Sequence, residues 1–263
     1  GNTMVSYTLT TTGCAITKQL TVNPLPVPIS GGSIVCEGSS LGLGSSPLGG
    51  TWSSADVTIA TVTTSGIATG VNAGIVNVSY ILNTGCYRIN AITVNPTPAA
   101  ISGTPVVCEG ATTNLSDATS GGVWSSNAPS IASINGLGTV TGGSAGFALI
   151  SYTISATGCR STVTVTVNAL PAPIGGATNV CVGSAAAVTN ATSGGTWSSA
   201  FPAIATVDAS GLVTGGSAGN TVISYILSGT GCGVASLFTV NALPSSIVGE
   251  DDICKDEMTG YTS

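Results

Sequence analysis

Eight cysteines are the residues of this chain whose type and spacing most directly suggest chemistry. They fall into two series, in each of which successive members are 72, 73 and 73 residues apart. The first series is Cys36, Cys108, Cys181 and Cys254, and the second is Cys14, Cys86, Cys159 and Cys232. The gaps do not match the CxxC spacing of zinc sites, and the chain has no histidine. We expect all eight to form disulfides, which predicts an extracellular, cell-surface or secreted protein.

The remaining residue types argue against catalysis. Without histidine there is no imidazole base for a serine or cysteine nucleophile and no imidazole metal ligand. Carboxylates do not recur as a pair in each repeat, and neither GxSxG nor a P-loop occurs. The sequence therefore predicts a protein that is not an enzyme, with no catalytic residue, no metal-binding residue and no cofactor.

One acidic cluster departs from the repeat pattern. Carboxylate oxygens gathered here could hold Ca²⁺. No equivalent position in the other repeats is acidic, so a solvated acidic edge is the simpler interpretation. The cluster consists of Glu250, Asp251, Asp252, Asp256 and Glu257.

The three tryptophans share the same short phrase at the same period as the cysteines. The sequence reads GGTWSS at 49–54, GGVWSS at 121–126 and GGTWSS at 194–199. Since each Trp follows a Gly-Gly turn near the middle of a repeat, we expect it to fill the core of its repeat. Stacking on a sugar or another ligand is the functional alternative. The expected core residues are Trp52, Trp124, Trp197, Tyr80, Tyr152 and Tyr225.

Short strands with regular turn signals are the elements that must position these residues. The run 162–167 places valines on one face and threonines on the other, and no segment has a capped helical period. In the second complete repeat we expect strands at 112–116, 122–126, 130–134, 139–142, 147–155 and 161–168. About seven such strands in 73 residues predict an all-β fold of tandem antiparallel β-sandwiches.

The third complete repeat carries a family resemblance. The phrases are GGTWSS at 194–199, IATV at 204–207, GLVTG at 211–215 and AGNTVISY at 218–225. In this order they resemble the bacterial immunoglobulin-like group 2 repeat of invasin- and intimin-type surface proteins. The cysteines resemble those of variants found in large secreted surface proteins. The resemblance implies an immunoglobulin-like sandwich used as a spacer or adhesion module, with no catalytic residue.

The period also predicts the domain organisation. We expect complete immunoglobulin-like repeats at 25–96, 97–169 and 170–242, a partial repeat with the last strands at 1–24, and one with the first strands at 243–263. Residues 1–7 align with 74–80, late in a repeat. This alignment suggests a window from a longer protein. No run of 18 apolar residues is present, so we expect no membrane span in this window.

The cysteine partners stay open at this stage. Pairing within a repeat, such as Cys36–Cys86, is the simplest scheme. In an immunoglobulin-like order, however, the two cysteines of one sandwich lie at opposite ends, farther apart than a disulfide can reach. Bridges between neighbouring repeats, Cys36–Cys159 and Cys108–Cys232, are the second scheme, and bridges between chains are the third.

Composition bounds the partners. Charged residues make up 5% of the chain and the net charge is −6, with only four dispersed cations, which argues against nucleic-acid binding. The weakly charged surface has little repulsion to keep copies apart. We therefore expect self-association, and the shaft of a filament is our first functional hypothesis. A spacer in a giant adhesin that binds a host or cell-surface ligand elsewhere is the second, and a carbohydrate-binding module is the third.

Overall fold

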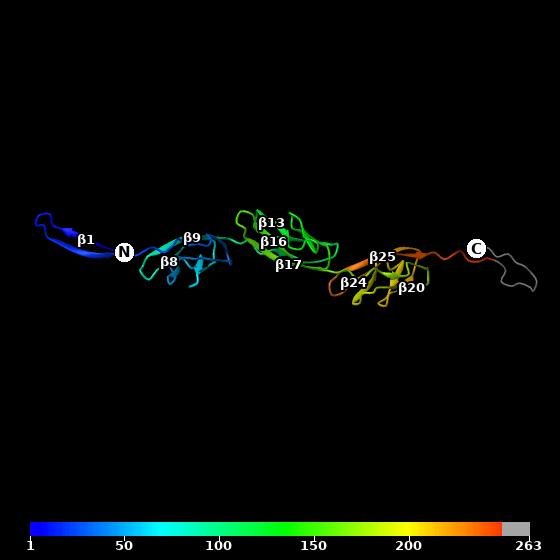
Figure 1. The fold of residues 1–263 in the computed structure, drawn as a ribbon. Coiled ribbons are helices and arrows are strands. Elements are labelled where there is room, and N and C mark those ends of the chain that lie inside the picture. Colours follow the sequence, from blue (N-terminus) through cyan, green and yellow to red (C-terminus); the bar gives the residue numbers. More distant parts are fainter. Residues whose placement is uncertain (249–263) are drawn as a thin grey trace, which may run out of the picture. The chain divides into compact units, whose positions relative to one another are not determined.

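The computed structural model describes residues 1–248, and these residues form 25 β-strands and no helix (Figure 1). The predicted all-β fold is confirmed. No helix in residues 1–248 could cross a membrane. By their internal contacts the residues divide into two units. One comprises Gly1–Ser102, Ser116–Ser125 and Ile150–Val163, and the other Gly103–Leu115, Ser126–Leu149 and the residues from Thr164 onward. The five-part division by sequence period stays a prediction.

The first complete repeat is built from two sheets. Its larger sheet has the strand order β3-β9-β8-β5, and its smaller sheet has the order β4-β7-β6. The strands are β3 (Ile34–Cys36), β4 (Ser40–Gly42), β5 (Thr51–Ser54), β6 (Ala60–Val62), β7 (Ile67–Gly70), β8 (Gly74–Ile81) and β9 (Tyr87–Asn95).

The second and third repeats follow the same plan with one added short strand each. Their larger sheets run β11-β17-β16-β13 and β19-β25-β24-β21, and their smaller sheets run β10-β12-β15-β14 and β18-β20-β23-β22. The second repeat contains β10 (Ser102–Gly103), β11 (Val106–Cys108), β12 (Thr112–Ser116), β13 (Gly122–Ser126), β14 (Ala132–Ile134), β15 (Thr139–Gly142), β16 (Gly146–Ile154) and β17 (Arg160–Asn168). The third contains β18 (Gly175–Gly176), β19 (Asn179–Cys181), β20 (Ala185–Thr189), β21 (Gly195–Ser199), β22 (Ala205–Val207), β23 (Leu212–Gly215), β24 (Gly219–Leu227) and β25 (Gly233–Asn241).

One pair of strands in each repeat departs from the antiparallel arrangement expected from the sequence. The first strand of the larger sheet, which ends at the first cysteine, pairs parallel with the last: β3 with β9, β11 with β17 and β19 with β25. In the first repeat Val35 lies opposite Val94, and Cys36 lies opposite Asn95. Because paired parallel strands end on the same side of a sheet, the first cysteine of a repeat lies beside the point where the chain leaves that repeat.

Alternating burial explains why these residues form a sandwich. In β8 the side chains of Val76, Val78 and Tyr80 are buried, while their neighbours are partly or fully exposed. Ile92 and Val94 of β9 face the same core. This period of two is what a strand with one buried face requires. The third repeat has an equivalent core, which consists of Val180, Val188, Ala205, Val213, Ile223, Phe238 and Val240.

Residues 1–24 contain only an antiparallel hairpin, β1 (Asn2–Thr8) with β2 (Ala15–Thr21). Every residue of both strands is exposed. In the alignment of 1–7 with 74–80, Val5 and Tyr7 correspond to Val78 and Tyr80, which are buried in the first complete repeat. The hairpin therefore has the sequence pattern of the last two strands of a sandwich, but among residues 1–248 no second sheet packs on it.

Candidate functional site: the disulfide junctions

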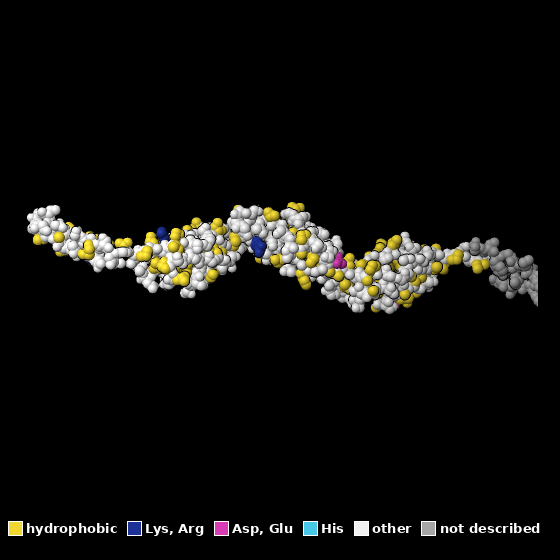
Figure 2. Space-filling view, in the orientation of Figure 1, with side chains coloured by type: hydrophobic (Ala, Val, Ile, Leu, Met, Phe, Trp, Pro, Cys, Tyr) yellow, Lys and Arg dark blue, Asp and Glu magenta, His cyan; other side chains and the backbone are white. Residues whose placement is uncertain are grey.

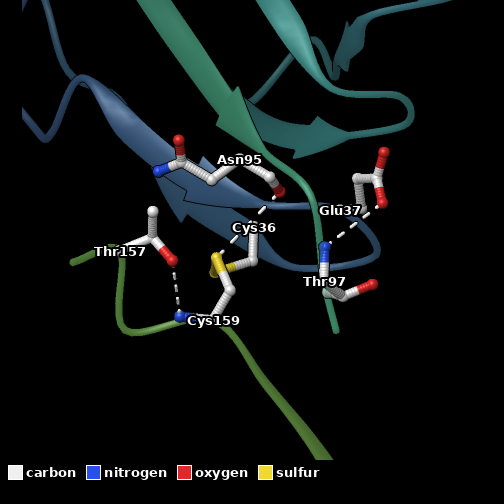
Figure 3. Close-up of a disulfide and its surroundings, with 6 residues drawn as sticks. All are labelled: Cys36, Glu37, Asn95, Thr97, Thr157 and Cys159. Carbon is white, nitrogen blue, oxygen red and sulfur yellow. Dashed lines mark hydrogen bonds between the residues drawn. A yellow bond between two sulfur atoms is a disulfide. The ribbon is translucent and has the colours of Figure 1, made fainter. Parts of the chain in front are cut away.

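Two disulfides join successive repeats. Cys36 of the first complete repeat is bonded to Cys159 of the second, with a Cα–Cα distance of 5.6 Å (Figure 3). Cys108 of the second repeat is bonded to Cys232 of the third, with a Cα–Cα distance of 5.7 Å. The bonded residues are 123 and 124 positions apart in the sequence. Of the three pairing schemes left open by the sequence, the structure contains the one that links neighbours.

Strand pairing places Cys36 at the end of its sandwich. It is the last residue of β3, beside Asn95, the last residue of β9. The next amide, that of Glu37, donates to the Asn95 carbonyl at 3.0 Å. Cys36 is therefore held against the strand from which the chain passes into the following linker.

Cys159 is presented by the turn between β16 and β17. Its carbonyl accepts from the Ile154 amide at 2.9 Å, and its own amide donates to the Thr157 hydroxyl at 3.3 Å. Its Sγ lies 4.0 Å from the Asn95 carbonyl oxygen of the first repeat (Figure 3). Although it sits in a turn, Cys159 is only 1% exposed. The junction therefore shields the sulfur from solvent.

A glutamate next to the first cysteine reinforces each junction. The Glu37 carboxylate accepts from the Ala73 amide at 2.7 Å and from the Thr97 amide at 3.3 Å. Thr97 lies in the linker that leads to the second repeat, so one side chain ties a turn of the sandwich to that linker (Figure 3).

Glu109 makes the same two contacts in the second repeat, to Ala145 at 2.7 Å and Leu170 at 3.3 Å. The third repeat has Val182 at this position. These glutamates were not predicted as functional residues from the sequence. The signal was the phrase VCEG, which occurs in two repeats and becomes VCVG in the third.

Three cysteines predicted to be bonded have free thiols in this structure. They are Cys14, Cys86 and Cys181. In the neighbour-to-neighbour scheme Cys14 and Cys86 would bond first-series cysteines at positions before residue 1, and Cys181 would bond a second-series cysteine at a position after residue 263. Cys254 and the acidic cluster at 250–257 lie outside the described residues.

Two of the free cysteines nevertheless occupy the same local positions as their bonded counterparts. The Cys86 thiol donates to the Asn23 carbonyl at 3.8 Å. The bonded Cys159 occupies the equivalent place, beside the Asn95 carbonyl of the preceding repeat. Cys181 ends β19 opposite Asn241. Cys86 and Cys181 are therefore placed as half-junctions.

The repeated GGxW phrase has a structural explanation. Gly49 has φ of 95°, a conformation that favours glycine. A Cβ on Gly50 would lie 2.6 Å from the Tyr80 ring, so only glycine lets the ring pack there. The Tyr80 hydroxyl accepts from the Gly50 amide at 2.9 Å and donates to the Pro47 carbonyl at 2.8 Å. Trp52 packs on the same ring, with the ring centroids 4.8 Å apart.

The three tryptophans expected in the core are less buried than the tyrosines on which they pack. Trp52, Trp124 and Trp197 are only partly buried. Trp52 and Trp197 pack against the edges of their cores. The physical reason is that β5 is an edge strand, so one side of the indole has no neighbouring strand. The predicted tyrosines Tyr80, Tyr152 and Tyr225 are buried.

Shallow hollows adjoin two of the indoles. The hollow beside Trp52 has a volume of about 230 Å³ and is lined also by Leu43, Leu48 and Tyr80. The one beside Trp197 has a volume of about 190 Å³. Both are smaller than the roughly 300–1,000 Å³ of typical small-molecule sites. The Trp contacts in this structure are therefore those of a tightly packed turn.

Sequence comparisons match parts of this chain to a known family and to a curated protein. Residues 184–230 match the family described as intimin, immunoglobulin-like domain. Ice-binding protein 1 of Shewanella frigidimarina (strain NCIMB 400) is 30% identical over 221 residues, which cover 73% of this chain. The chain spans only 24% of that relative's length.

Solved structures that match the chain include invasin and a surface layer protein. Invasin, a bacterial integrin-binding protein, gives a TM-score of 0.38 at 15% identity over 95% of this chain and 67% of its own. Domains 1–6 of the surface layer protein SbsC give a TM-score of 0.27 at 16% identity, over 90% of this chain and 44% of its own.

Proposed function

Because the repeats are bacterial immunoglobulin-like domains of the invasin and intimin type, we propose that this chain is the covalently stiffened shaft of an extracellular filament or fibre. The family predicted from the sequence is confirmed, and with it a location at the cell surface or outside the cell. An adhesin-like or structural role follows from the family. The disulfide junctions are the observation that supports a shaft in particular.

The junctions support stiffness for a geometric reason. Two repeats joined only by a short linker can swivel about it. A second covalent connection between Cys36 and Cys159, in addition to the linker, removes most of that freedom. Glu37 further restrains the linker through the Thr97 amide.

The surface supports lateral packing of copies. Figure 2 shows apolar side chains spread among uncharged polar ones, with very few charged groups. On the outer face of β8 and β9 a hollow of about 350 Å³ is lined by Ile81, Tyr87 and Ile89. Tyr87 and Ile89 are each about half exposed. Weak charge repulsion and exposed apolar side chains both favour association.

The alternative is a spacer in a giant adhesin, whose ligand-binding domain lies elsewhere. The two functions differ in self-association. A shaft subunit should form ordered side-by-side or end-to-end assemblies in electron micrographs as its concentration rises, with a matching increase in sedimentation coefficient. Oxidised chains that remain separate at all concentrations would contradict the shaft and favour the spacer. Replacing Ile89 by Lys should weaken assembly, whereas the same change at Thr61, an exposed residue of β6 in the smaller sheet, should not.

A further inference from the structure

The cysteine spacing divides each period into a short and a long segment. Each cysteine of the second series lies 22 residues before one of the first, as in Cys14 to Cys36 and Cys159 to Cys181. The short segment contains the last strand of one repeat, the linker and the first strand of the next repeat's larger sheet. In segments 86–108 and 159–181 the short strands β10 and β18 also lie within it. The long segment, about 50 residues, contains all the intervening strands.

The disulfides connect the short segments to one another. From Cys14 a covalent path runs along the backbone to Cys36, crosses the bridge to Cys159 and continues along the backbone to Cys181. This path has 44 backbone residues, whereas the backbone alone has 167 between the same ends. Strands β4 to β8 and β12 to β16 lie outside it.

A second path runs from Cys86 to Cys108 and across the other bridge to Cys232. In every complete repeat one path uses the first strand and the other uses the last strand. These two strands are hydrogen-bonded neighbours, as β3 and β9 show. The two covalent paths are therefore tied together laterally by one parallel strand pair in each sandwich.

The short segments have little slack. Segment 159–181 contains β17, β18 and β19, which are already extended strands. The linker between β17 and β18 includes Pro171 and Pro173, and proline-rich linkers are themselves extended. Pulling on this path can therefore lengthen it only slightly.

We propose that the junction disulfides make the array an inextensible tether, in which tension bypasses the strands that form most of each sandwich. This load-bearing activity deepens the proposed shaft function, and it concerns the single chain rather than its assembly. At roughly 3.5 Å per residue, the path from Cys14 to Cys181 can reach about 150 Å, against about 580 Å for the same residues without bridges.

Single-molecule stretching between Cys14 and Cys181 tests this proposal. Both thiols are exposed and can carry the handles directly. Cys86 and Cys254 are replaced by Ser so that no other thiol reacts. We expect oxidised molecules to stop extending at roughly 150 Å. With reductant, the contour should increase by the 123 residues between Cys36 and Cys159, about 430 Å.

Two variants provide matched controls. Removing the bridge on the pulled path, by Cys36→Ser with Cys159→Ser, should restore the long contour without reductant. Removing the other bridge, by Cys108→Ser with Cys232→Ser, should leave the short contour unchanged.

Two results would overturn the proposal. An oxidised molecule that extends to about 580 Å has no disulfide path around the intervening strands. One that stops at roughly 230 Å has bridges within repeats instead of between them. If the chains fail to assemble but single oxidised chains still show the short contour, only the shaft function is rejected. The tether is measured on isolated chains and does not depend on assembly.

Discussion

At the scale of single residues, each position of the GGxW phrase has a separate task. The first glycine adopts a backbone that L side chains rarely take, and the second leaves room for a tyrosine ring. The tyrosine hydroxyl then satisfies two backbone groups of the same turn. Sequence periodicity pointed to a role shared by all repeats. It could not show that the glycine, rather than the tryptophan, has the least freedom to change, because the tyrosine lies 30 residues away.

Replacing Gly50 by Ala should destabilise the first repeat by about 1–3 kcal/mol, because the new methyl would overlap the Tyr80 ring. Denaturant unfolding followed by the fluorescence of Trp52 measures this. Gly32→Ala is the matched control, since a Cβ there meets nothing within 4 Å. Equal effects of the two changes would argue against the packing role of Gly50.

Acid should weaken one turn of the third repeat. Hydrogen bonds from the Ser210 hydroxyl and the Leu212 amide hold the pKa of Asp208 below its usual range. Since the folded-state pKa is depressed, the stabilisation is present above the unfolded pKa of about 3.9 and is lost as the pH falls through the folded value.

Asp208→Asn is the variant that isolates this effect. In the second repeat Asn135 makes the equivalent bonds to Leu137 and Thr139 without titrating. The difference in Tm between the wild type and Asp208→Asn should be largest at neutral pH and should shrink as the pH drops below about 4. A difference that does not change with pH would show that the carboxylate charge is unimportant here.

At the scale of elements, the parallel pair of first and last strands determines what the cysteines can reach. It places the first cysteine of a repeat at the end of the sandwich from which the chain leaves, whereas the second cysteine sits in a turn at the other end. Six of the eight strands in the second repeat were predictable, because short runs rich in β-branched residues between turn residues mark them, whereas β10 and β11 were not among the expected strands. β12, β13 and β15 begin and end where expected, and β14, β16 and β17 differ by one or two residues.

The disulfide pairing could be narrowed from the sequence but not decided. Both series share one period, so spacing alone suits pairing within or between repeats equally well. The pairing is decided by the distance between the strand end that carries Cys36 and the turn that carries Cys159. That distance depends on the orientation that the linker gives to the next sandwich. The Glu37 contact to Thr97 contributes to that direction, and its importance cannot be judged from a single VCEG phrase.

Glu37→Ala should loosen the first junction locally. The Ala73 and Thr97 amides lose their acceptor, so their hydrogen exchange should accelerate by at least tenfold, as expected when a bond to a charged group is removed. The Ala145 and Leu170 amides, which Glu109 holds, serve as the internal control. Unchanged exchange at Thr97 would mean that the linker is held by other contacts.

At the scale of the whole molecule, the bridges overlap, because Cys108 lies inside the loop that Cys36 and Cys159 close. Cross-linking residues 123 positions apart restricts the unfolded chain and can stabilise the folded one by up to about 5 kcal/mol. The variant Cys36→Ser with Cys159→Ser should therefore unfold at a lower denaturant concentration than the wild type. Equal midpoints would show that the bridge acts only on the relative motion of repeats.

The tryptophans separate the structural account from carbohydrate binding. Since the indoles pack on tyrosine rings beside hollows too small for a typical ligand, polysaccharides should leave the Trp fluorescence unchanged. Saturable quenching that disappears in Trp52→Phe would instead support a sugar site.

The connectivity of the disulfides in the native protein is the most direct test of the account. The chain contains only four Lys and Arg residues, so digestion with pepsin at low pH suits it better than trypsin and also prevents disulfide exchange. Mass spectrometry of the unreduced peptides should find Cys36 linked to Cys159 and Cys108 linked to Cys232. Peptides that link Cys36 to Cys86, or Cys108 to Cys159, would contradict it and leave a string of independent domains.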